Sequence, residues 1–247
     1  MSELWKEYAK SDSRYLTSDS FVLSVEGFTV AAIATSIDLR TFCLAMPSTR
    51  PQLRLTLPDV DVDTVIDTEK LPVLNPEDLA HPADIQGLVD HYTDMDYAKG
   101  RVSILAFLYL YSCIIPKDMR GLGIELSVRS HIPVGAGLGS SASFSVCVAA
   151  ALLNISGKLM GPGKRQLSPE DLATINKWAF DAEQVIHGTP SGIDNTVSTY
   201  GGFIYYQKGR ETQTIQSKHP LRVIITNTRA PRNTRALVSG VRELWTK

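Results

Sequence analysis

The sequence predicts an α+β domain rather than a regular array of alternating strands and helices. Short stretches with strand patterning lie in both halves of the chain, long apolar helices lie between them, and no segment repeats. The chain has 247 residues, of which 43% are hydrophobic and 21% are charged, as in most globular proteins. It is long enough to bury a substantial core.

The charge balance and the cysteines limit the classes of function. Lys and Arg number 25 and Asp and Glu number 26, which gives a net charge of −1. A nearly neutral chain has no overall electrostatic attraction to nucleic acid or to an anionic membrane. The longest apolar run, residues 102–115, is shorter than the roughly 20 residues that span a bilayer, and it predicts a buried helix. The three cysteines have no pair spacing and predict buried free thiols. We therefore expect a cytoplasmic protein without a nucleic-acid or membrane partner.

The N-terminal part of the chain predicts mainly strands. Residues 1–20 are polar and aperiodic, which is typical of a leader or a disordered end. Strand patterning occurs in residues 21–25 and 40–45, and small apolar residues fill 30–37. Residues 52–62 alternate between apolar and polar side chains, which predicts a half-buried strand or a hairpin.

Three aspartates, Asp59, Asp61 and Asp63, fall in or beside this alternating segment and suggest calcium. An EF-hand loop that starts at Asp59 needs Gly at its sixth position and Glu at its twelfth, where this sequence has Thr64 and Lys70. We therefore expect solvated aspartates on an alternating strand.

The second half of the chain predicts helices and strands in mixed order. Ser168, Pro169 and Asp171 have the types and spacing of a capping box at the start of a helix that ends at His187. The apolar stripe of that helix comprises Leu172, Ile175, Trp178, Ala179, Ala182 and Ile186. The remaining predicted elements are strands at 124–130, 200–207 and 221–226, a hairpin partner at 212–216, and helices at 144–155 and 235–245.

A glycine-rich segment connects a predicted strand to a predicted helix. Gly135, Gly137 and Gly139 allow close approach of the backbone to a ligand, and the helix start after them offers unpaired N–H groups. The segment therefore predicts a phosphate site. Ser140 and Ser141 follow, where one hydroxyl can cap the helix and the other can reach a metal ion. The spacing matches neither a Walker A loop nor the dinucleotide fingerprint, and a plain glycine turn is the alternative.

Two carboxylates flank the turn after the capping-box helix. Glu183 lies at the margin of the apolar stripe, where a carboxylate is partly desolvated. Asp194 follows a segment too rich in Gly and Pro for a continuous helix, so the two side chains can converge across a tight turn. Near a phosphate site, one carboxylate would hold Mg²⁺ and the other would orient or deprotonate an attacking hydroxyl. Two surface acids are the alternative, and His187 is interpreted as a helix C-terminal residue.

A cluster of arginines lies near the C-terminus. Arg229, Arg232 and Arg235 follow a predicted strand. Guanidinium groups in such a cluster can bind a carboxylate or a phosphate. A solvated turn in which Asn233 or Thr234 caps the next helix is the alternative.

Several strings of the sequence resemble the GHMP kinases. PVGAGLGSSASFSVCVAAALL is similar to the second motif of that superfamily. INKWAFDAEQVIHGTPSGIDNTVSTYGG, TNTRAPRNTRALVSGVR, LAFLYLYSC and SIDLRTF resemble its mevalonate kinase family. The resemblance covers roughly residues 30–242, with a variable stretch at 64–100. It implies the N-terminal α+β domain of the superfamily, similar to domain 2 of ribosomal protein S5, over residues 21–235, and the start of a C-terminal domain at 236–247.

The resemblance also implies roles for individual residues. The residues implied to bind ATP are Ser130, Gly135, Ala136, Gly137, Leu138, Gly139, Ser140, Ser141 and Asp59, the last of which is often Asn in the family. Ser141 and Glu183 would hold Mg²⁺, and Asp194 would be the catalytic acid–base residue. Arg232 and Thr234 would lie on the mevalonate side. The implied reaction is the transfer of a phosphoryl group from ATP to mevalonate. Whether the protein forms a homodimer is left open.

The sequence departs from the family in two places. The family's first motif, Pro-Gly-Lys followed by Gly-Glu-His, would fall between Val25 and Glu26 and is absent, and no lysine occurs between Lys10 and Lys70. The sequence also ends at Lys247, before the family's Gly-rich third motif. These departures favour one alternative, a non-catalytic nucleotide-binding remnant. A second alternative, a related kinase for another small alcohol, fits the HGTPSGIDN and NTRAPRNTR strings poorly.

Overall fold

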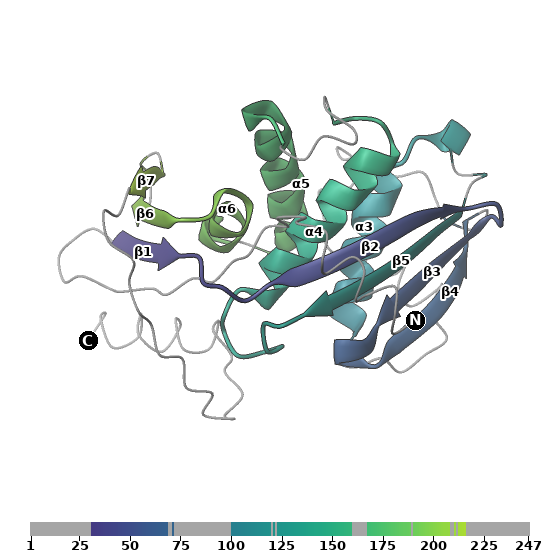
Figure 1. Cartoon of the computed structure of the whole chain (residues 1–247), viewed down its shortest axis with the longest axis horizontal. Helices are drawn as coiled ribbons and strands as arrows, with labels where there is room; N and C mark the ends of the chain where they lie inside the picture. The colour runs from purple at the N-terminus through teal and green to yellow at the C-terminus, as the bar shows by residue number, and fades with distance from the viewer. Residues whose placement is uncertain are drawn as a thin grey trace.

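The computed structural model describes residues 31–68, 71, 100–119, 121, 123–159, 167–188, 190–207, 210 and 212–215. Several expectations lie outside these residues, namely the leader at 1–20, the strands at 21–25 and 221–226, the helix at 235–245, the junction of Val25 and Glu26, and the predicted mevalonate-side residues Arg232 and Thr234. The described part contains a larger sheet with three helices and a smaller sheet with one helix (Figure 1).

Four strands form the larger sheet, in the order β2-β5-β3-β4. The strands are β2 (Thr41–Ser48), β3 (Gln52–Leu57), β4 (Val62–Asp67) and β5 (Gly123–Ser130). β5 pairs antiparallel with β2 and parallel with β3, and β3 and β4 form an antiparallel hairpin. Buried side chains alternate along β3 and β4, which confirms the half-buried hairpin predicted from residues 52–62 and extends it to Asp67.

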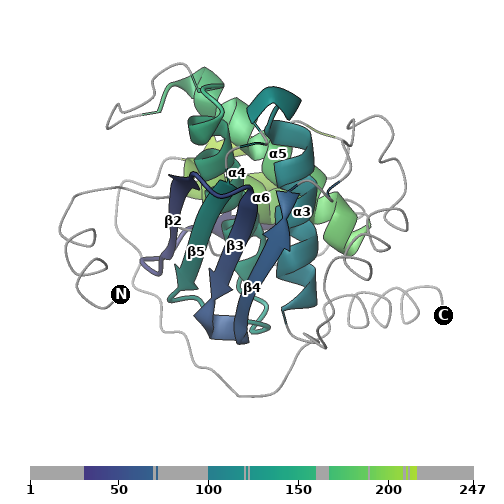
Figure 2. The ribbon, with the colours of Figure 1, turned by 90° about the vertical axis from the view of Figure 1, so that its right-hand side faces the viewer.

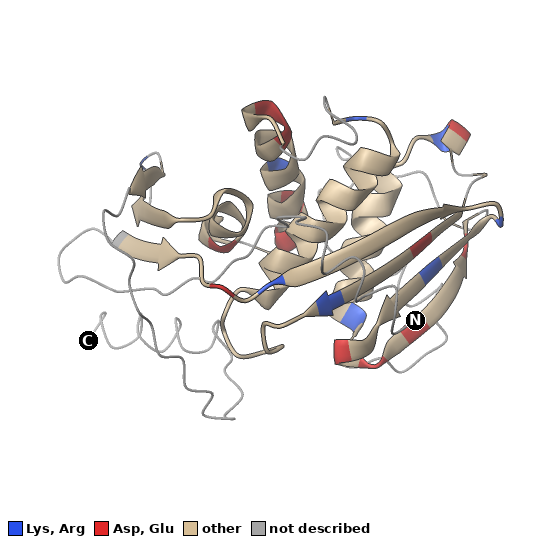
Figure 3. Ribbon diagram, in the orientation of Figure 1, with Lys and Arg blue, Asp and Glu red and all other residues tan. Residues whose placement is uncertain are grey.

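Three helices lie on one side of this sheet (Figure 2). They are α3 (Arg101–Ile114), α4 (Ser140–Ile155) and α5 (Pro169–His187), and α4 among them contacts β2 directly. The predicted apolar helix is α3, whose Phe107 and Tyr111 are among the largest fully buried side chains. α4 packs between α3, α5 and β2 and carries no Lys, Arg, Asp or Glu, as Figure 3 shows. A helix enclosed on several sides excludes charges because an unpaired buried charge is strongly unfavourable.

The start of α5 has the predicted capping box. The Oγ of Ser168 accepts a hydrogen bond from the backbone N–H of Asp171, and the backbone N–H of Ser168 donates to the Oδ2 of Asp171, both at 3.1 Å. This reciprocal pair satisfies N–H groups that a helix start leaves unpaired, which typically stabilises a helix by about 1 kcal/mol. Of the predicted stripe, Ile175, Ala179 and Ala182 are fully buried.

The smaller sheet consists of β1 (Ala31–Thr35), β6 (Phe203–Gln207) and β7 (Gln213–Ile215), in the antiparallel order β1-β6-β7. β7 is the predicted hairpin partner of β6. Helix α6 (Ile193–Tyr200) packs on this sheet through a second core cluster made of Ala32, Ala34, Ile193, Val197 and Ile204. The small sheet lies near the end of the larger sheet where β2 begins and β5 ends (Figure 1).

The three aspartates lie mainly in a turn, which corrects one expectation. Asp59 lies in a 3₁₀ turn, Pro58–Val60, and Asp61 follows it with a left-handed φ of 56°. Asp63 alone of the three lies on a strand, where its Oδ2 accepts a hydrogen bond from Arg54 at 3.1 Å. The predicted continuous strand is interrupted at Pro58, which has no backbone N–H to donate to a strand ladder. The alternation of apolar and polar residues in the sequence nevertheless continues across this turn.

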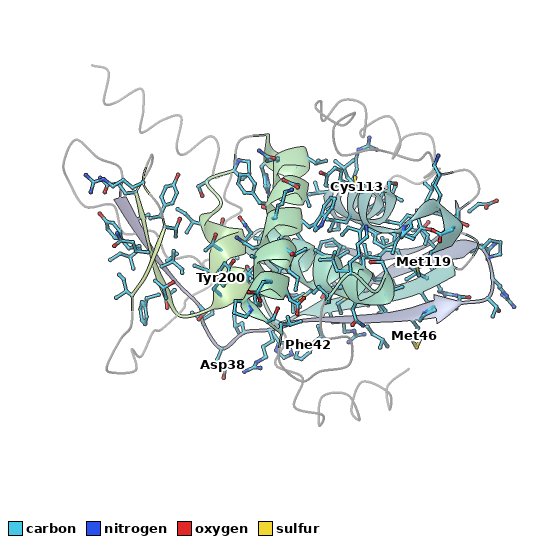
Figure 4. All side chains as sticks on the ribbon, turned by 90° about the horizontal axis from the view of Figure 1, so that it is seen from above. Asp38, Phe42, Met46, Cys113, Met119 and Tyr200 are labelled. Carbon is cyan, nitrogen blue, oxygen red and sulfur yellow. The ribbon has the colours of Figure 1, made fainter. Side chains whose placement is uncertain are left out.

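The cysteines form no disulfide in the described part of the chain. Cys147 on α4 is buried as predicted, whereas Cys43 and Cys113 are half-buried. Figure 4 labels Cys113, which belongs to the helical layer, and Phe42 and Met46, which lie along β2. No helix among the described residues is both long and apolar enough to cross a membrane.

Candidate active site

The loop between β5 and α4 passes through left-handed backbone conformations. Gly135, Gly137 and Gly139 have φ angles of 74°, 74° and 72°. Residues with a side chain rarely adopt such angles, so the path of the loop explains its three glycines. A Cβ at Gly135 or Gly137 would meet no atom within 4 Å, so the space over the loop is open. Between the glycines, Ala136 and Leu138 are half-buried.

Helix α4 begins at the end of this loop without a side-chain cap. Gly139 is the N-cap residue and Ser140 is the first helical residue, so the expectation that Ser140 or Ser141 caps the helix is wrong. The first backbone N–H groups of a helix have no carbonyl partner within it, and the helix dipole is positive there. An uncapped helix start below an open space has the properties of a phosphate-binding site.

A serine on α4 and two residues of α5 meet beside this helix start. The Oγ of Ser141 donates to the Oε2 of Glu183 at 3.2 Å and lies 3.4 Å from the Nε2 of His187. The Oγ of Ser145 donates to the other carboxylate oxygen, Oε1, at 3.2 Å. Each helix contributes residues four apart, which therefore lie on the same helix face. The predicted metal ligands Ser141 and Glu183 are thus in direct contact.

Glu183 is an acid with unusual surroundings. Its side chain is almost fully buried, and burial raises its pKa from 4.5 to about 7. The hydrogen bond from Ser141 lowers the pKa, the charge of Asp194 raises it, and the bond from Ser145 lowers it. Desolvation outweighs the hydrogen bonds, and a nearby cation would restore the ionised form. The sequence predicted partial desolvation here, and the burial is deeper than predicted.

Asp194 lies in the first turn of α6, close enough for its charge to act on both Glu183 and His187. The sequence predicted that Asp194 and Glu183 can converge across a turn, and the described residues between α5 and α6 are indeed not helical, but it did not predict helix α6, which begins at Ile193. The missed signal is the pair Ile193 and Val197, which are four residues apart and both buried in the second core cluster.

A buried amide pair holds α6 on α5. The Nδ2 of Asn195 donates to the Oδ1 of Asn176 at 2.7 Å, and the Oγ1 of Thr199 donates to the same oxygen at 3.3 Å. Asn195 is buried, so the loss of this bond would leave a desolvated amide. Because Asp194 precedes Asn195, this contact helps to fix the position of Asp194 relative to Glu183. Sequence reasoning did not single out either asparagine.

A second polar network supports the other side of the loop. The backbone N–H of Ser130 donates to the Oδ2 of Asp59 at 2.7 Å, so these two predicted nucleotide residues are neighbours. The Oγ of Ser130 lies 2.8 Å from the Oγ1 of Thr41, to which the Oγ of Ser143 also donates at 2.6 Å. The network joins β5, β2 and α4. Thr41 and Ser143 were missed because a single buried hydroxyl leaves no pattern in the sequence.

The donor set limits what metal ion the site can hold. The described residues contain no group of three or more His, Cys, Asp or Glu side chains that could hold a metal ion. An ion beside Glu183 therefore needs further oxygen ligands, such as the hydroxyl of Ser141, phosphate oxygens and water. Mg²⁺ accepts such a set, usually one or two protein ligands together with phosphate and water. Ser141 and Glu183 fit a Mg²⁺ ion that arrives with a nucleotide.

The segment that contains α3, β5, the glycine-rich loop and α4 to α6 is similar to the N-terminal domain of the GHMP kinases, whose family model matches residues 104–202. This similarity and the observed mixture of strands and helices confirm the predicted α+β fold. Among curated proteins, the chain is similar to mevalonate kinases. It is 39% identical over 229 residues to the mevalonate kinase of Homo sapiens, covering 85% of this chain and 57% of that protein.

Two further comparisons agree with this assignment. The mevalonate kinase of Arabidopsis thaliana is 50% identical over 140 residues, covering 56% of this chain and 36% of that protein. The structure of the L. major mevalonate kinase in complex with R-mevalonate superposes with a TM-score of 0.52 at 23% identity, covering 81% of this chain and 51% of that chain, which supports the fold alone. The chain spans little more than half the length of the human relative.

Proposed function

We propose that this chain is a cytoplasmic mevalonate kinase, which transfers the γ-phosphoryl group of ATP to the primary hydroxyl of mevalonate. The observation that carries the proposal is the meeting of three features at one end of the fold. The open glycine loop, the buried Glu183 and the first turn of α6 with Asp194 come from separate segments of the chain. The similarity to curated mevalonate kinases supports the choice of substrate.

In this proposal the loop and the start of α4 bind the phosphates of ATP. The uncapped start of α4, beside the open space at Gly135 and Gly137, would offer backbone N–H groups and the positive end of the helix dipole to a polyanion. Ser130 and Asp59, which are hydrogen-bonded at the base of the loop, would lie near the rest of the nucleotide. Positioning of this kind is a large part of catalysis in phosphoryl transfer.

Ser141 and Glu183 would hold the Mg²⁺ ion of Mg·ATP. When bound, this ion would neutralise charge on the transferred phosphoryl group. The cation would also lower the raised pKa of Glu183, because an adjacent positive charge favours the carboxylate. The two serines that donate to Glu183 orient both of its oxygens.

Asp194 would orient the mevalonate hydroxyl and accept its proton as the new O–P bond forms. The carboxylate stands in the first turn of α6, which the Asn195–Asn176 contact fixes on α5. Arg232 and Thr234 would contact the other end of mevalonate, as the resemblance to the family implies.

The test is a product assay on the 247-residue chain with Mg·ATP and one of three alcohols. We expect ADP and 5-phosphomevalonate with mevalonate, and no phosphorylated product with homoserine or galactose. Phosphorylation of another alcohol instead would overturn the substrate assignment. Binding of ATP without any phosphorylated product would support the non-catalytic alternative and contradict the proposal.

A further inference from the structure

One buried hydroxyl connects the two ends of the glycine-rich loop. Thr41 is the first residue of β2 and lies opposite Ser130, the last residue of β5, in the sheet register. Its Oγ1 lies 2.8 Å from the Oγ of Ser130, after which the loop begins, and 2.6 Å from the Oγ of Ser143 in the first turn of α4. The backbone N–H of Ser143 donates to the carbonyl oxygen of Gly139, where the loop ends, at 3.0 Å. Both ends of the loop are therefore tied to a single oxygen atom.

Helix α4 contacts Thr41 at two points. Cys147, which is four residues after Ser143 and so on the same helix face, donates its thiol hydrogen to the backbone carbonyl oxygen of Thr41 at 3.4 Å. The middle of the loop lacks comparable support, because a Cβ at Gly135 or Gly137 would meet no atom within 4 Å. The path of the loop therefore depends on how its ends are held.

The hydrogen atoms of this network can be assigned by counting donors and acceptors. A hydroxyl has one hydrogen to donate and two lone pairs that accept. Ser143 donates to Thr41, and the acceptor that the described residues offer to the hydrogen of Thr41 is the Oγ of Ser130. The backbone N–H of Ile132 donates to the same Oγ at 3.1 Å. Both lone pairs of Ser130 are then occupied, so its own hydrogen is left to donate to an acceptor such as a phosphate oxygen.

We propose that Thr41 is a positioning residue for the nucleotide, whose hydroxyl fixes the two ends of the glycine loop and makes Ser130 a hydrogen-bond donor. The proposal rests on the proposed function, because it takes the loop to be the phosphate site. Thr41 is only 1% exposed, so it acts through Ser130 and Ser143 and does not touch a ligand itself. Loss of its hydroxyl would let the end of β5 and the start of α4 shift relative to each other. The loop would then be less well placed for the phosphates, and the nucleotide would bind more weakly.

The test compares Thr41→Val, which removes the hydroxyl and keeps the branched shape, with Thr41→Ser, which keeps the hydroxyl. Isothermal titration calorimetry on the 247-residue chain gives the Kd for Mg·ATP, and steady-state kinetics give the KM for each substrate. We expect Thr41→Val to raise the Kd and the KM for ATP about 3–10-fold, roughly the affinity equivalent of one hydrogen bond, with the KM for mevalonate unchanged. Thr41→Ser should bind Mg·ATP as the parent does.

Thr68→Val is the matched control for the loss of a buried hydroxyl. Thr68 is 3% exposed, and its Oγ1 donates to the carbonyl oxygen of Pro51 at 2.8 Å. Pro51 precedes β3, whereas the loop follows β5, which runs parallel to β3, so the control lies at the opposite end of the sheet. Thr68→Val should lose stability to urea and keep the Kd for Mg·ATP. Equal Kd values in the parent and Thr41→Val would overturn the proposal and leave the kinase function standing, and an equal rise of the Kd in Thr68→Val would also overturn it.

A second variant separates positioning from a loss of folding. Ser143→Ala removes one of the two hydroxyl contacts of Thr41 and suits a helix, so it serves if Thr41→Val unfolds. Since Ser143 acts through Thr41, the double variant should bind Mg·ATP no more weakly than Thr41→Val. An unchanged Kd in Ser143→Ala, or losses of affinity that add in the double variant, would overturn the proposal. The expected pattern of Kd values in a chain that makes no 5-phosphomevalonate would support the role of Thr41 while the kinase function fails.

Discussion

The Oγ of Ser141 on α4 donates a 3.2 Å hydrogen bond to the Oε2 of Glu183 on α5. The two residues are 42 positions apart in the sequence, and their contact depends on the packing of the two helices that carry them. Ser141 also stands two residues after Gly139, the N-cap of α4. The contact therefore joins the start of the proposed phosphate site to the buried carboxylate.

Substitution of Gly137 by Val should abolish nucleotide binding without unfolding the chain. The φ of 74° strains a β-branched residue, at a cost of about 1–3 kcal/mol, but the side chain would enter open space rather than protein. That space is where the proposed phosphates lie. We expect Mg·ATP to raise the melting temperature of the parent and not of Gly137→Val, as measured by differential scanning fluorimetry.

Gly157 provides a matched control for this strain. Its φ is 69°, a Cβ there would also meet no atom within 4 Å, and it follows the opposite end of α4. Gly157→Val should lose a similar amount of stability and keep the protection by Mg·ATP. If Mg·ATP raises the melting temperature of Gly137→Val as much as that of Gly157→Val, the glycine loop does not bind phosphate and is only a turn.

Replacement of Asp194 by Asn should remove the proposed proton acceptor, the carboxylate, while keeping a side chain of nearly the same size and shape. We expect the kcat of mevalonate phosphorylation to fall by about 10²–10⁴-fold, the usual contribution of acid–base catalysis, with little change in the affinity for Mg·ATP. Steady-state kinetics and ATP titration measure the two quantities separately. Asp38→Asn is the control, since Asp38 is exposed and pairs with Arg40. Near-normal turnover by Asp194→Asn would remove Asp194 from the mechanism.

The elements that sequence reasoning predicted correctly are those whose signal is local. The capping box of α5 requires residues three apart, and the core helix α3 is a continuous apolar run. Helix α6 was missed because it has only 8 residues and follows Gly192. A helix this short is unstable alone, so it depends on the Asn195–Asn176 contact and on the second core cluster.

The candidate site was predictable only in part for a similar reason. The glycine loop is a local pattern, and the resemblance to a family supplied roles for Ser141, Glu183 and Asp194. The places of Thr41 and Ser143 depend on which strand lies beside which helix, a relation that no short window of sequence contains. The contact of His187 with Ser141 is likewise a product of helix packing. The assigned roles themselves stay predictions.

The amide pair between α5 and α6 should contribute to stability and to catalysis together. Asn195→Ala leaves the Oδ1 of Asn176 with only the 3.3 Å hydrogen bond from Thr199 and should cost about 1 kcal/mol in urea unfolding. Because α6 carries Asp194, we expect kcat to fall while the affinity for Mg·ATP is kept. Asn154→Ala, at an exposed position of α4, should change neither quantity. Loss of stability with unchanged kcat would show that the pair does not position Asp194.

The thiols of Cys147, which is buried, and Cys43, which is half-buried, should resist alkylation in the folded chain. Burial raises the pKa of Cys147 to about 12, and burial together with Cys147 raises the pKa of Cys43. At pH 8 a thiol of pKa about 12 is ionised in roughly one molecule in 10⁴, and only the thiolate reacts. Mass spectrometry after treatment with iodoacetamide should find both cysteines unmodified in native buffer and modified in urea. Rapid labelling of Cys147 in native buffer would contradict its burial.

Replacement of Glu183 by Gln should flatten the pH dependence of stability in the metal-free chain. The pKa of Glu183 is about 7 in the folded state against 4.5 for an ordinary glutamate, so between these values the folded chain holds a proton that the unfolded chain has released. The resulting stabilisation is complete below about pH 4.5 and is lost as the pH rises through 7, with a total on the order of 3 kcal/mol. Urea unfolding in EDTA at pH 5 and pH 8 should show this loss in the parent and not in Glu183→Gln. Glu125→Gln, at an exposed position of β5, should behave as the parent does. Parallel pH profiles for the parent and Glu183→Gln would show that the carboxylate is solvated, and both the buried acid and its proposed role in holding a cation would then have to be abandoned.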